Sequence, residues 1–130
     1  MLNFRRLLMS EKTLYDRLGG YEGIAAFAND LMPRVHADSQ LGRFYQNRGT
    51  HGLAREKQLL IDFLCSNAGG QAYYRGLNMK LTHKGMKINE KDWTALMGHI
   101  DETITALKVP KQERDDVAAF VLSLKENIVE

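Results

Sequence analysis

The sequence predicts an all-α fold in a single domain. Apolar residues recur at steps of three and four along the longer segments, which is the period of a helix that buries one face. No segment alternates convincingly between apolar and polar residues, as a half-buried strand would. Glycine pairs at 19–20 and 69–70, together with Pro110, divide the chain into pieces of helical length. At 130 residues and 44% apolar content, one core of ordinary size is expected.

The N-terminal half predicts a very short helix followed by a longer one. Thr13 and Asp16 form a capping pair, and the glycines at 19–20 end the helix that this pair begins. A second helix is expected over residues 21–36, and Pro33 should kink it because proline removes one backbone donor. The apolar positions of this helix are Ile24, Phe27, Leu31 and Val35.

The middle of the chain predicts a short helix, a loop and a long amphipathic helix. Asp38 is placed to cap the short helix, which carries Leu41, Phe44 and Tyr45. Residues 46–52 are polar and hold two glycines, so they predict a loop. The long helix is expected over 53–68, and it is followed by irregular chain up to Gly76. Its apolar stripe consists of Leu53, Leu60, Phe63 and Leu64.

Two long helices are expected in the C-terminal part of the chain. Asn89 and Asp92 form a second capping pair, and Pro110 opens the last helix. The apolar positions of the first of these helices are Trp93, Leu96, Met97, Ile100, Ile104 and Leu107. Those of the second are Val117, Phe120, Val121, Leu124 and Ile128.

Composition argues against several classes of partner. Lys plus Arg number 18 and Asp plus Glu 16, and these charges are interspersed, so there is no basic stripe for nucleic acid. No apolar run approaches the ~20 residues of a membrane span. The single cysteine, Cys65, excludes an internal disulfide, and we expect a reducing cytoplasm. Residues 1–12 are interpreted as an extension or a short amphipathic surface helix rather than a signal peptide, before a domain over 13–130.

His83 is the main candidate for chemistry. It lies on a short segment between the irregular tract and a long helix. A metal-ligating imidazole must be held in one tautomer and orientation, and a short helix pinned between loops can do this. A partly buried, hydrogen-bonded histidine is the plainer alternative. Irregular backbone that stays ordered inside a small domain favours a flat apolar cofactor as its packing partner.

Several motifs follow one another in a familiar order. They are Tyr15-Asp16-Arg17-Leu18-Gly19-Gly20, Ala37-Asp38 with Leu41 and Phe44-Tyr45, Gly69-Gly70, Tyr74-Arg75-Gly76, and Met79-Lys80-Leu81-Thr82-His83. Together they resemble the truncated haemoglobins, closest to the first group of that family. The resemblance implies a globin-like two-over-two helical sandwich that holds haem b, with His83 as the proximal iron ligand. Covalent attachment is not expected, since no Cys-x-x-Cys-His occurs.

The same resemblance assigns side chains to the haem. The candidates for its apolar lining are Phe44, Leu60, Phe63, Leu64, Met79, Met86, Ile88 and Leu96, with plain core packing as the alternative for each. The candidates for its propionates are Tyr74, Arg75 and Lys80, with simple solvation as the alternative.

The distal side departs from the family pattern. Met32 stands where first-group members usually place a tyrosine that hydrogen-bonds oxygen. Glutamine positions of the distal helix are matched by Glu56 and Leu60 or, with a slip of one residue, by Lys57 and Ile61. Tyr45 is a candidate replacement donor, worth about 0.5 to 1.5 kcal/mol to a bound ligand. A phenol that points outward is the alternative.

The remaining histidines and the cysteine are given no catalytic role. His51 is expected to be a solvated loop residue near the distal side, with binding to iron as a sixth ligand the alternative. His36 is expected to be exposed, His99 is expected on or near the surface, and Cys65 is expected to act as a small hydrophobe.

The function implied by the resemblance is reversible binding of dioxygen and other diatomic gases by ferrous haem, as in oxygen transport. Nitric oxide dioxygenation or peroxidase-like turnover would need a separate reductase, because the chain has no room for one of its own. A hypothesis of another class is a cofactor-free helical interaction module, in which Tyr73, Trp93 and the methionines form a core or a partner surface.

Overall fold

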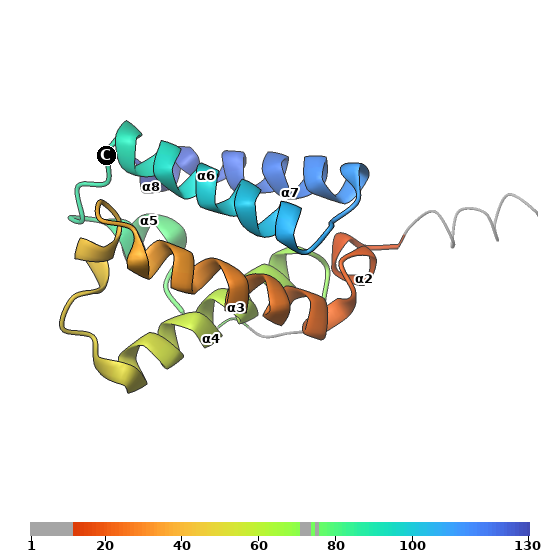
Figure 1. Ribbon diagram of the computed structural model, residues 1–130, viewed down its shortest axis with the longest axis horizontal. Coiled ribbons are helices and arrows are strands. Elements are labelled where there is room, and N and C mark those ends of the chain that lie inside the picture. The colour runs from red at the N-terminus through yellow and green to blue at the C-terminus, as the bar shows by residue number, and fades with distance from the viewer. Residues whose placement is uncertain (1–11, 71–73, 75) are drawn as a thin grey trace, which may run out of the picture.

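The computed structural model describes residues 12–70, 74 and 76–130, and every regular element among them is a helix (Figure 1). The elements are α2 (Leu14–Arg17), α3 (Gly20–Ala37), the 3₁₀ helix η1 (Gly42–Tyr45), α4 (Gly49–Asn67), α5 (Met79–His83), α6 (Glu90–Ala106), α7 (Lys111–Ser123) and α8 (Lys125–Ile128). The all-α prediction is therefore confirmed. The predicted extension falls almost entirely in residues 1–11, which lie outside the described residues, as do Tyr73 and Arg75.

The long helices form two pairs that pack on each other. Helix α3 packs against α4 in one pair and against α6 of the other pair, in which α7 runs beside α6 (Figure 1). The short helix α5 lies at one end, where it contacts α8. This arrangement is the two-over-two sandwich that the sequence predicted.

The predicted capping residues begin their helices as expected. The Thr13 hydroxyl accepts a hydrogen bond from the Asp16 amide at 3.1 Å, and Asn89 and Asp92 form a reciprocal capping box at the start of α6. Gly19 separates α2 from α3 in a left-handed conformation, with φ at 95°. Local sequence signals were therefore sufficient to predict these helix ends.

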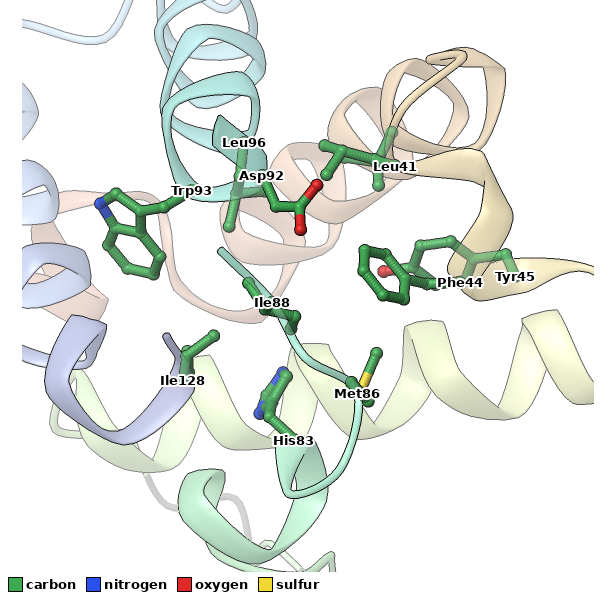
Figure 2. Close-up of a pocket in the computed structure, with 11 residues that line it drawn as sticks. Leu41, Phe44, Tyr45, His83, Met86, Ile88, Asp92, Trp93, Leu96 and Ile128 are labelled. Atoms are coloured by element: carbon green, nitrogen blue, oxygen red, sulfur yellow. The ribbon is translucent and has the colours of Figure 1, made fainter. Parts of the chain in front are cut away.

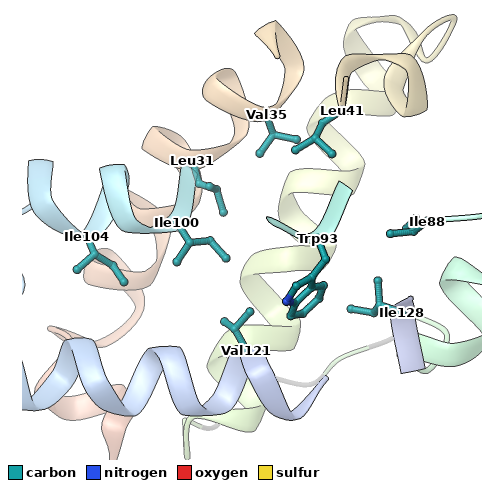
Figure 3. Packing of buried hydrophobic residues seen from close by; sticks show 9 residues of the cluster. All are labelled: Leu31, Val35, Leu41, Ile88, Trp93, Ile100, Ile104, Val121 and Ile128. Carbon is teal, nitrogen blue, oxygen red and sulfur yellow. The ribbon is translucent and has the colours of Figure 1, made fainter. Parts of the chain in front are cut away.

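The core consists of two clusters of buried side chains. The larger cluster joins both pairs of helices, and Trp93 packs with Val121 and Ile128 at its centre (Figure 3). Its buried members are Leu31, Val35, Leu41, Ile88, Trp93, Ile100, Ile104, Val121 and Ile128. The smaller cluster lies between α3 and α4, and its buried members are Ile24, Ala28, Ile61 and Cys65. Cys65 is fully buried, as expected of a small hydrophobe.

Three details of the predicted helices are wrong. Helix α4 begins at Gly49, so the predicted loop over 46–52 is too long. The most buried line of α4 includes Ile61 and Cys65, whereas Leu60 and Leu64 are half-buried. The last predicted helix breaks at Leu124 into α7 and α8. Helix α3 runs past Pro33, as the predicted range requires.

A large apolar cavity lies at the end of the molecule that carries α2. It is bounded by α2, α3, α4, α6 and α7 and has a volume of about 890 Å³, counting the space that opens to solvent. Its lining is Leu14, Leu18, Gly23, Ile24, Ala26, Phe27, Leu64, Ala68, Ile104, Leu107, Val109, Val117, Phe120 and Val121. We call this space the far cavity, to distinguish it from the cavity that forms the candidate functional site.

Candidate functional site

The candidate site is a second cavity, between η1, α5 and the start of α6 (Figure 2). Its volume is about 490 Å³ including the space that opens to solvent, within the range of small-molecule sites. The lining residues are Val35, Leu41, Phe44, Tyr45, His83, Met86, Ile88, Asp92, Trp93, Leu96 and Ile128. Most of this wall is apolar, so the few polar side chains in it are the ones available for chemistry.

His83 enters the cavity from α5 with one ring nitrogen already used. The Asn78 side chain caps this short helix by accepting a hydrogen bond from the Leu81 amide at 2.8 Å. The His83 Nδ1 atom lies 2.8 Å from the carbonyl oxygen of Met79. A carbonyl only accepts, so Nδ1 donates this hydrogen bond, and in the neutral ring the lone pair is then on Nε2. This is the arrangement of a metal-ligating imidazole with its second acceptor in place.

The chain after His83 is tied to the C-terminal residue. The Glu130 carboxylate accepts hydrogen bonds from the amides of Gly85 and Lys87, and the Glu130 amide donates to the Ile88 carbonyl at 2.8 Å. Hydrogen bonds from the Gly85 and Lys87 amides hold the pKa of Glu130 below its usual value. The segment that follows the histidine is therefore fixed through its main chain.

The opposite wall is held by side chains that converge on Asp92. Its carboxylate receives Arg43 Nη2 at 2.9 Å, Gln40 Nε2 at 2.8 Å and the Asn89 amide at 3.0 Å, and its side chain is fully buried. The hydrogen bond from Arg43 is the main cause that lowers the pKa of Asp92 to about 2. The Arg43 guanidinium also lies 4.2 Å from the centre of the Phe44 ring. These contacts fix η1 against the start of α6.

Tyr45 points its ring into the cavity from η1 (Figure 2). Its ring centre lies 4.5 Å from that of His36, with an angle of 57° between the planes. Burial raises the pKa of the Tyr45 phenol, and the charge of Glu56 raises it further against the opposing charge of Arg48. The phenol is therefore protonated at neutral pH and can donate a hydrogen bond.

The sequence-predicted site residues fall into two sets. Six of them line this cavity: Phe44, Tyr45, His83, Met86, Ile88 and Leu96. Six do not: Leu60, Phe63, Leu64, Tyr74, Met79 and Lys80. Leu60 and Leu64 pack on the smaller core cluster, and Met79 packs on the larger one. Lys80 is exposed, the Phe63 ring lies 5.3 Å from the Tyr74 ring, and the Tyr74 hydroxyl donates to the Leu77 carbonyl.

The other lining residues were not foreseen as part of the site. Trp93 and Ile128 were predicted as core positions, and Asp92 only as a capping residue. Val35 and Leu41 complete this second group. Their helical period signals burial but does not say which buried residues face a cavity.

The histidines differ from expectation in two places. His36 is half-buried and its Nε2 atom has no hydrogen-bond partner, so the expected surface position is wrong. His99 is half-buried near the surface, in line with expectation, with Nε2 at 2.7 Å from Asp38 Oδ2. His51 is exposed as expected, but it lies in the first turn of α4 rather than in a loop.

The side chains at this site suit a metal ion that receives most of its ligands from a cofactor rather than from the protein. Within residues 12–70, 74 and 76–130, no group of three or more His, Cys, Asp or Glu side chains is placed to hold an ion. One free imidazole nitrogen in an apolar cavity fits iron whose other ligands come from a porphyrin. In the same part of the chain, no helix has the length and apolar character needed to cross a membrane.

Comparisons with known proteins place the chain among globins. A family model described as bacterial-like globin matches residues 13–130. The group 1 truncated hemoglobin GlbN of Mycolicibacterium paratuberculosis is 30% identical over 116 residues, which cover 89% of this chain and 83% of the relative. A group 1 truncated hemoglobin of Tetrahymena thermophila is 27% identical over 88% of this chain and 92% of that protein. The Fe(III) structure of truncated hemoglobin from Tetrahymena pyriformis superposes with a TM-score of 0.82 at 24% identity, covering 91% of this chain and 98% of that one.

Proposed function

The chain belongs to the group 1 truncated haemoglobins, within the bacterial-like globins, whose cofactor is haem iron. On this premise we propose that it binds dioxygen and other diatomic gases reversibly, with His83 as the proximal ligand of haem b. The observation that carries the proposal is the hydrogen bond between His83 Nδ1 and the Met79 carbonyl at 2.8 Å. In the neutral ring this hydrogen bond leaves the lone pair of Nε2 free to bind a metal at the apolar cavity.

When bound, haem b supplies an iron with an open coordination position, which takes diatomic gases when ferrous and the anions of weak acids when ferric. The chain's own part is to hold this group and to exclude water. Phe44, Met86, Ile88 and Leu96 bring apolar surface to the cavity, so holding the group rests on burial together with one imidazole bond. The Tyr45 hydroxyl is the candidate donor toward the partly negative outer atom of dioxygen.

Turnover with nitric oxide or with peroxide is the enzymatic extension of this proposal. Each needs electrons returned after the reaction, and therefore a separate reductase. The substrate pocket would be the same cavity, with Tyr45 as the hydrogen-bond donor.

The proposal is tested by supplying haem to the purified protein and recording ferric, ferrous and carbon monoxide-bound absorption spectra. Wild-type protein should show a Soret band and a carbon monoxide complex. The substitution His83→Ala should weaken haem retention by about a hundredfold or more, since it removes the metal ligand itself. His51→Ala is the matched control, because this histidine is exposed in α4, and it should leave the spectra unchanged.

Two results would overturn the proposal. Wild-type protein without a Soret band after haem is supplied would favour the cofactor-free helical module. Full haem affinity in the His83→Ala variant would remove the proximal assignment.

A further inference from the structure

Helix α5 and the residues that flank it have one half-buried side and one exposed side. Met79 and His83 are half-buried, and His83 lines the candidate site. The exposed side chains before Gly85 follow one another at steps of three and four, so they share a face of this short helix. We call the exposed set the α5 surface, and it consists of Leu77, Lys80, Leu81, Lys84 and Lys87.

The α5 surface holds two exposed leucines in fixed positions. Leu77 is 61% exposed and Leu81 is 53% exposed. The Leu77 carbonyl accepts hydrogen bonds from the hydroxyls of Tyr74 and Thr82, the latter at 3.1 Å. The Leu81 amide donates to the Asn78 side chain at 2.8 Å. Neighbouring apolar side chains held in this way form a small patch that a protein partner can cover.

The α5 surface is also cationic. No Asp or Glu occurs between Asp62 and Glu90, although the chain has 16 acidic residues. Among the described residues, the lysines that form ion pairs are Lys111 and Lys125, so those of the α5 surface are available to an approaching molecule. Glu130 adds one negative charge beside this surface, but two main-chain amides already bind its carboxylate. Positive charge therefore surrounds the two leucines.

We propose that the α5 surface docks an acidic one-electron carrier, a protein with a reduced flavin or iron–sulfur centre that keeps the iron of this protein ferrous. This inference rests on the proposed function, because gas binding needs ferrous iron. In the transfer, the carrier loses one electron and the ferric iron gains it. No bond forms or breaks, and no proton moves. The proposed function names a separate reductase only for turnover, whereas this inference assigns the docking surface and the charge of the partner.

The position of the α5 surface suits the delivery of electrons. His83 lies on the same five-residue helix, so a docked carrier is separated from its ring by about the diameter of one helix, roughly 10 Å. The chain is fixed before α5 at Leu77 and after it through Glu130, so docking orders little that is loose. Complexes of electron carriers bury little area and use charge to steer association. A small apolar patch among lysines fits such a complex.

Other anionic partners fit this surface less well. A helix that binds a membrane surface buries a long apolar face, whereas α5 has five residues and this surface offers two leucines. A nucleic acid backbone is neutralised by a longer array of cations than three lysines, and the two leucines would add nothing to phosphate contacts. An acidic protein uses both the charges and the apolar patch.

The first test measures docking without electron transfer. Oxidised flavodoxin, an acidic carrier with a flavin, is added to the carbon monoxide-bound protein, and backbone amide signals are followed by NMR. The amides of Leu81, Lys84 and Lys87 should shift at low salt and return toward their free positions as salt is added, because salt screens exposed charges. Cytochrome c, a basic carrier, should leave them unchanged. Flavodoxin-induced shifts confined to other parts of the molecule would overturn the proposal.

The second test measures the transfer itself. Ferric haem-loaded protein is mixed with reduced flavodoxin under carbon monoxide, which traps the ferrous form, and absorption gives the rate. Lys80→Glu combined with Lys84→Glu should slow reduction about tenfold or more at low salt, because the steering charge is reversed. The matched control is Lys108→Glu combined with Lys111→Glu, two exposed lysines between α6 and α7 at the end away from α5 (Figure 1). This control should stay within about threefold of wild type.

A third variant separates the apolar contact from the charges. Leu81→Ser should weaken flavodoxin binding about fivefold or more, because a leucine covered by the partner loses its burial. The salt dependence of binding should stay as in wild type, since no charge changes. Leu122→Ser is the matched control, because this leucine is 59% exposed on α7. Equal binding by the two leucine variants would overturn the docking patch.

The remaining outcomes separate this inference from the proposed function. A protein that takes up no haem would overturn the proposed function. Normal haem uptake and carbon monoxide binding, with flavodoxin reduction unchanged in the Lys80→Glu and Lys84→Glu double variant, would overturn this inference alone. Reduced lumiflavin, which is small and uncharged, should reduce that variant and wild type at equal rates. Equal slowing with lumiflavin and flavodoxin would overturn the inference, and so would binding to anionic phospholipid vesicles without binding to flavodoxin.

Discussion

The two walls of the candidate site are fixed in different ways. On the proximal side, the segment after His83 is held by main-chain amides that donate to the exposed Glu130 carboxylate. On the opposite side, η1 is held by Arg43 and Gln40, whose side chains converge on the buried Asp92 carboxylate. We call these two sets of contacts the Glu130 tie and the Asp92 tie. The Glu130 tie consists of exposed hydrogen bonds, whereas the Asp92 tie depends on a carboxylate that is buried away from water.

This difference indicates where the site's stability resides. Exposed hydrogen bonds exchange readily with water and contribute little each, whereas a buried carboxylate depends on all of its donors at once. We therefore expect the Asp92 tie to be essential to the fold, while the Glu130 tie mainly restrains local motion.

Asp92→Ala should cost about 3 kcal/mol in the free energy of unfolding, because it removes a charged acceptor of several hydrogen bonds and half of a capping box. Denaturation in urea measures the change. Glu90→Gln is the control in the same first turn of α6, where the glutamate is exposed and paired with Lys125. This control should cost less than about 1 kcal/mol. Equal losses from the two variants would refute the contrast.

Acid should weaken the Asp92 tie within a defined range of pH. The pKa of Asp92 is about 2 in the folded protein against 3.8 for the free group. A lowered pKa contributes stability that is fully present above the unfolded value and is lost as the pH falls toward the folded value. Stability should thus fall between about pH 4 and pH 2, measured by urea unfolding. Asp92→Asn should flatten this dependence, and an unaltered slope in that variant would contradict the assignment.

Tyr45→Phe tests whether the opposite wall also supplies a ligand contact. Loss of one donor worth about 0.5 to 1.5 kcal/mol should speed dioxygen dissociation by up to about tenfold. Stopped-flow displacement of dioxygen measures the rate. Tyr21→Phe is the control, since that hydroxyl is exposed and bonds to Gln58 on the surface. Equal dissociation rates for Tyr45→Phe and wild type would leave Tyr45 without this role.

Glu130→Gln should have the smallest effect. It weakens the acceptor of the Gly85 and Lys87 amides, so their hydrogen exchange should become up to about tenfold faster. Global stability should change little. Glu126→Gln is the control on the exposed face of α8. Global unfolding caused by Glu130→Gln would show that the proximal tie is as important as the Asp92 tie.

Much of the fold was predictable because its signals are local. Helix caps at Thr13, Asn89 and Asp92 depend on residues three apart, and the glycine pairs end helices for steric reasons. The start of α4 was missed because glycines at 49 and 52 lower helix propensity. The Arg48–Glu56 pair, which bridges the beginning of this helix, accompanies the extra turn.

The site was only partly predictable because it depends on how the chain folds back. The position of His83 between an irregular tract and a long helix made it a candidate. The resemblance then suggested Phe44, Tyr45, Met86, Ile88 and Leu96, which line the same cavity. His36 is half-buried because the Tyr45 ring of η1 packs against it at the end of α3. The spacing of apolar residues along one helix cannot predict a contact between two different elements. Likewise, the capping role of Asp92 was foreseen, but its bonds to Arg43 and Gln40 come from a distant turn.

The far cavity has a consequence for the volume of the molecule. Unfolding eliminates internal voids, so the unfolded chain and its water occupy less space than the folded protein does. The enclosed part of the far cavity is an apolar void of this kind. Hydrostatic pressure should therefore lower the stability of the folded protein. Xenon dissolved under mild compression should oppose that collapse by filling apolar space.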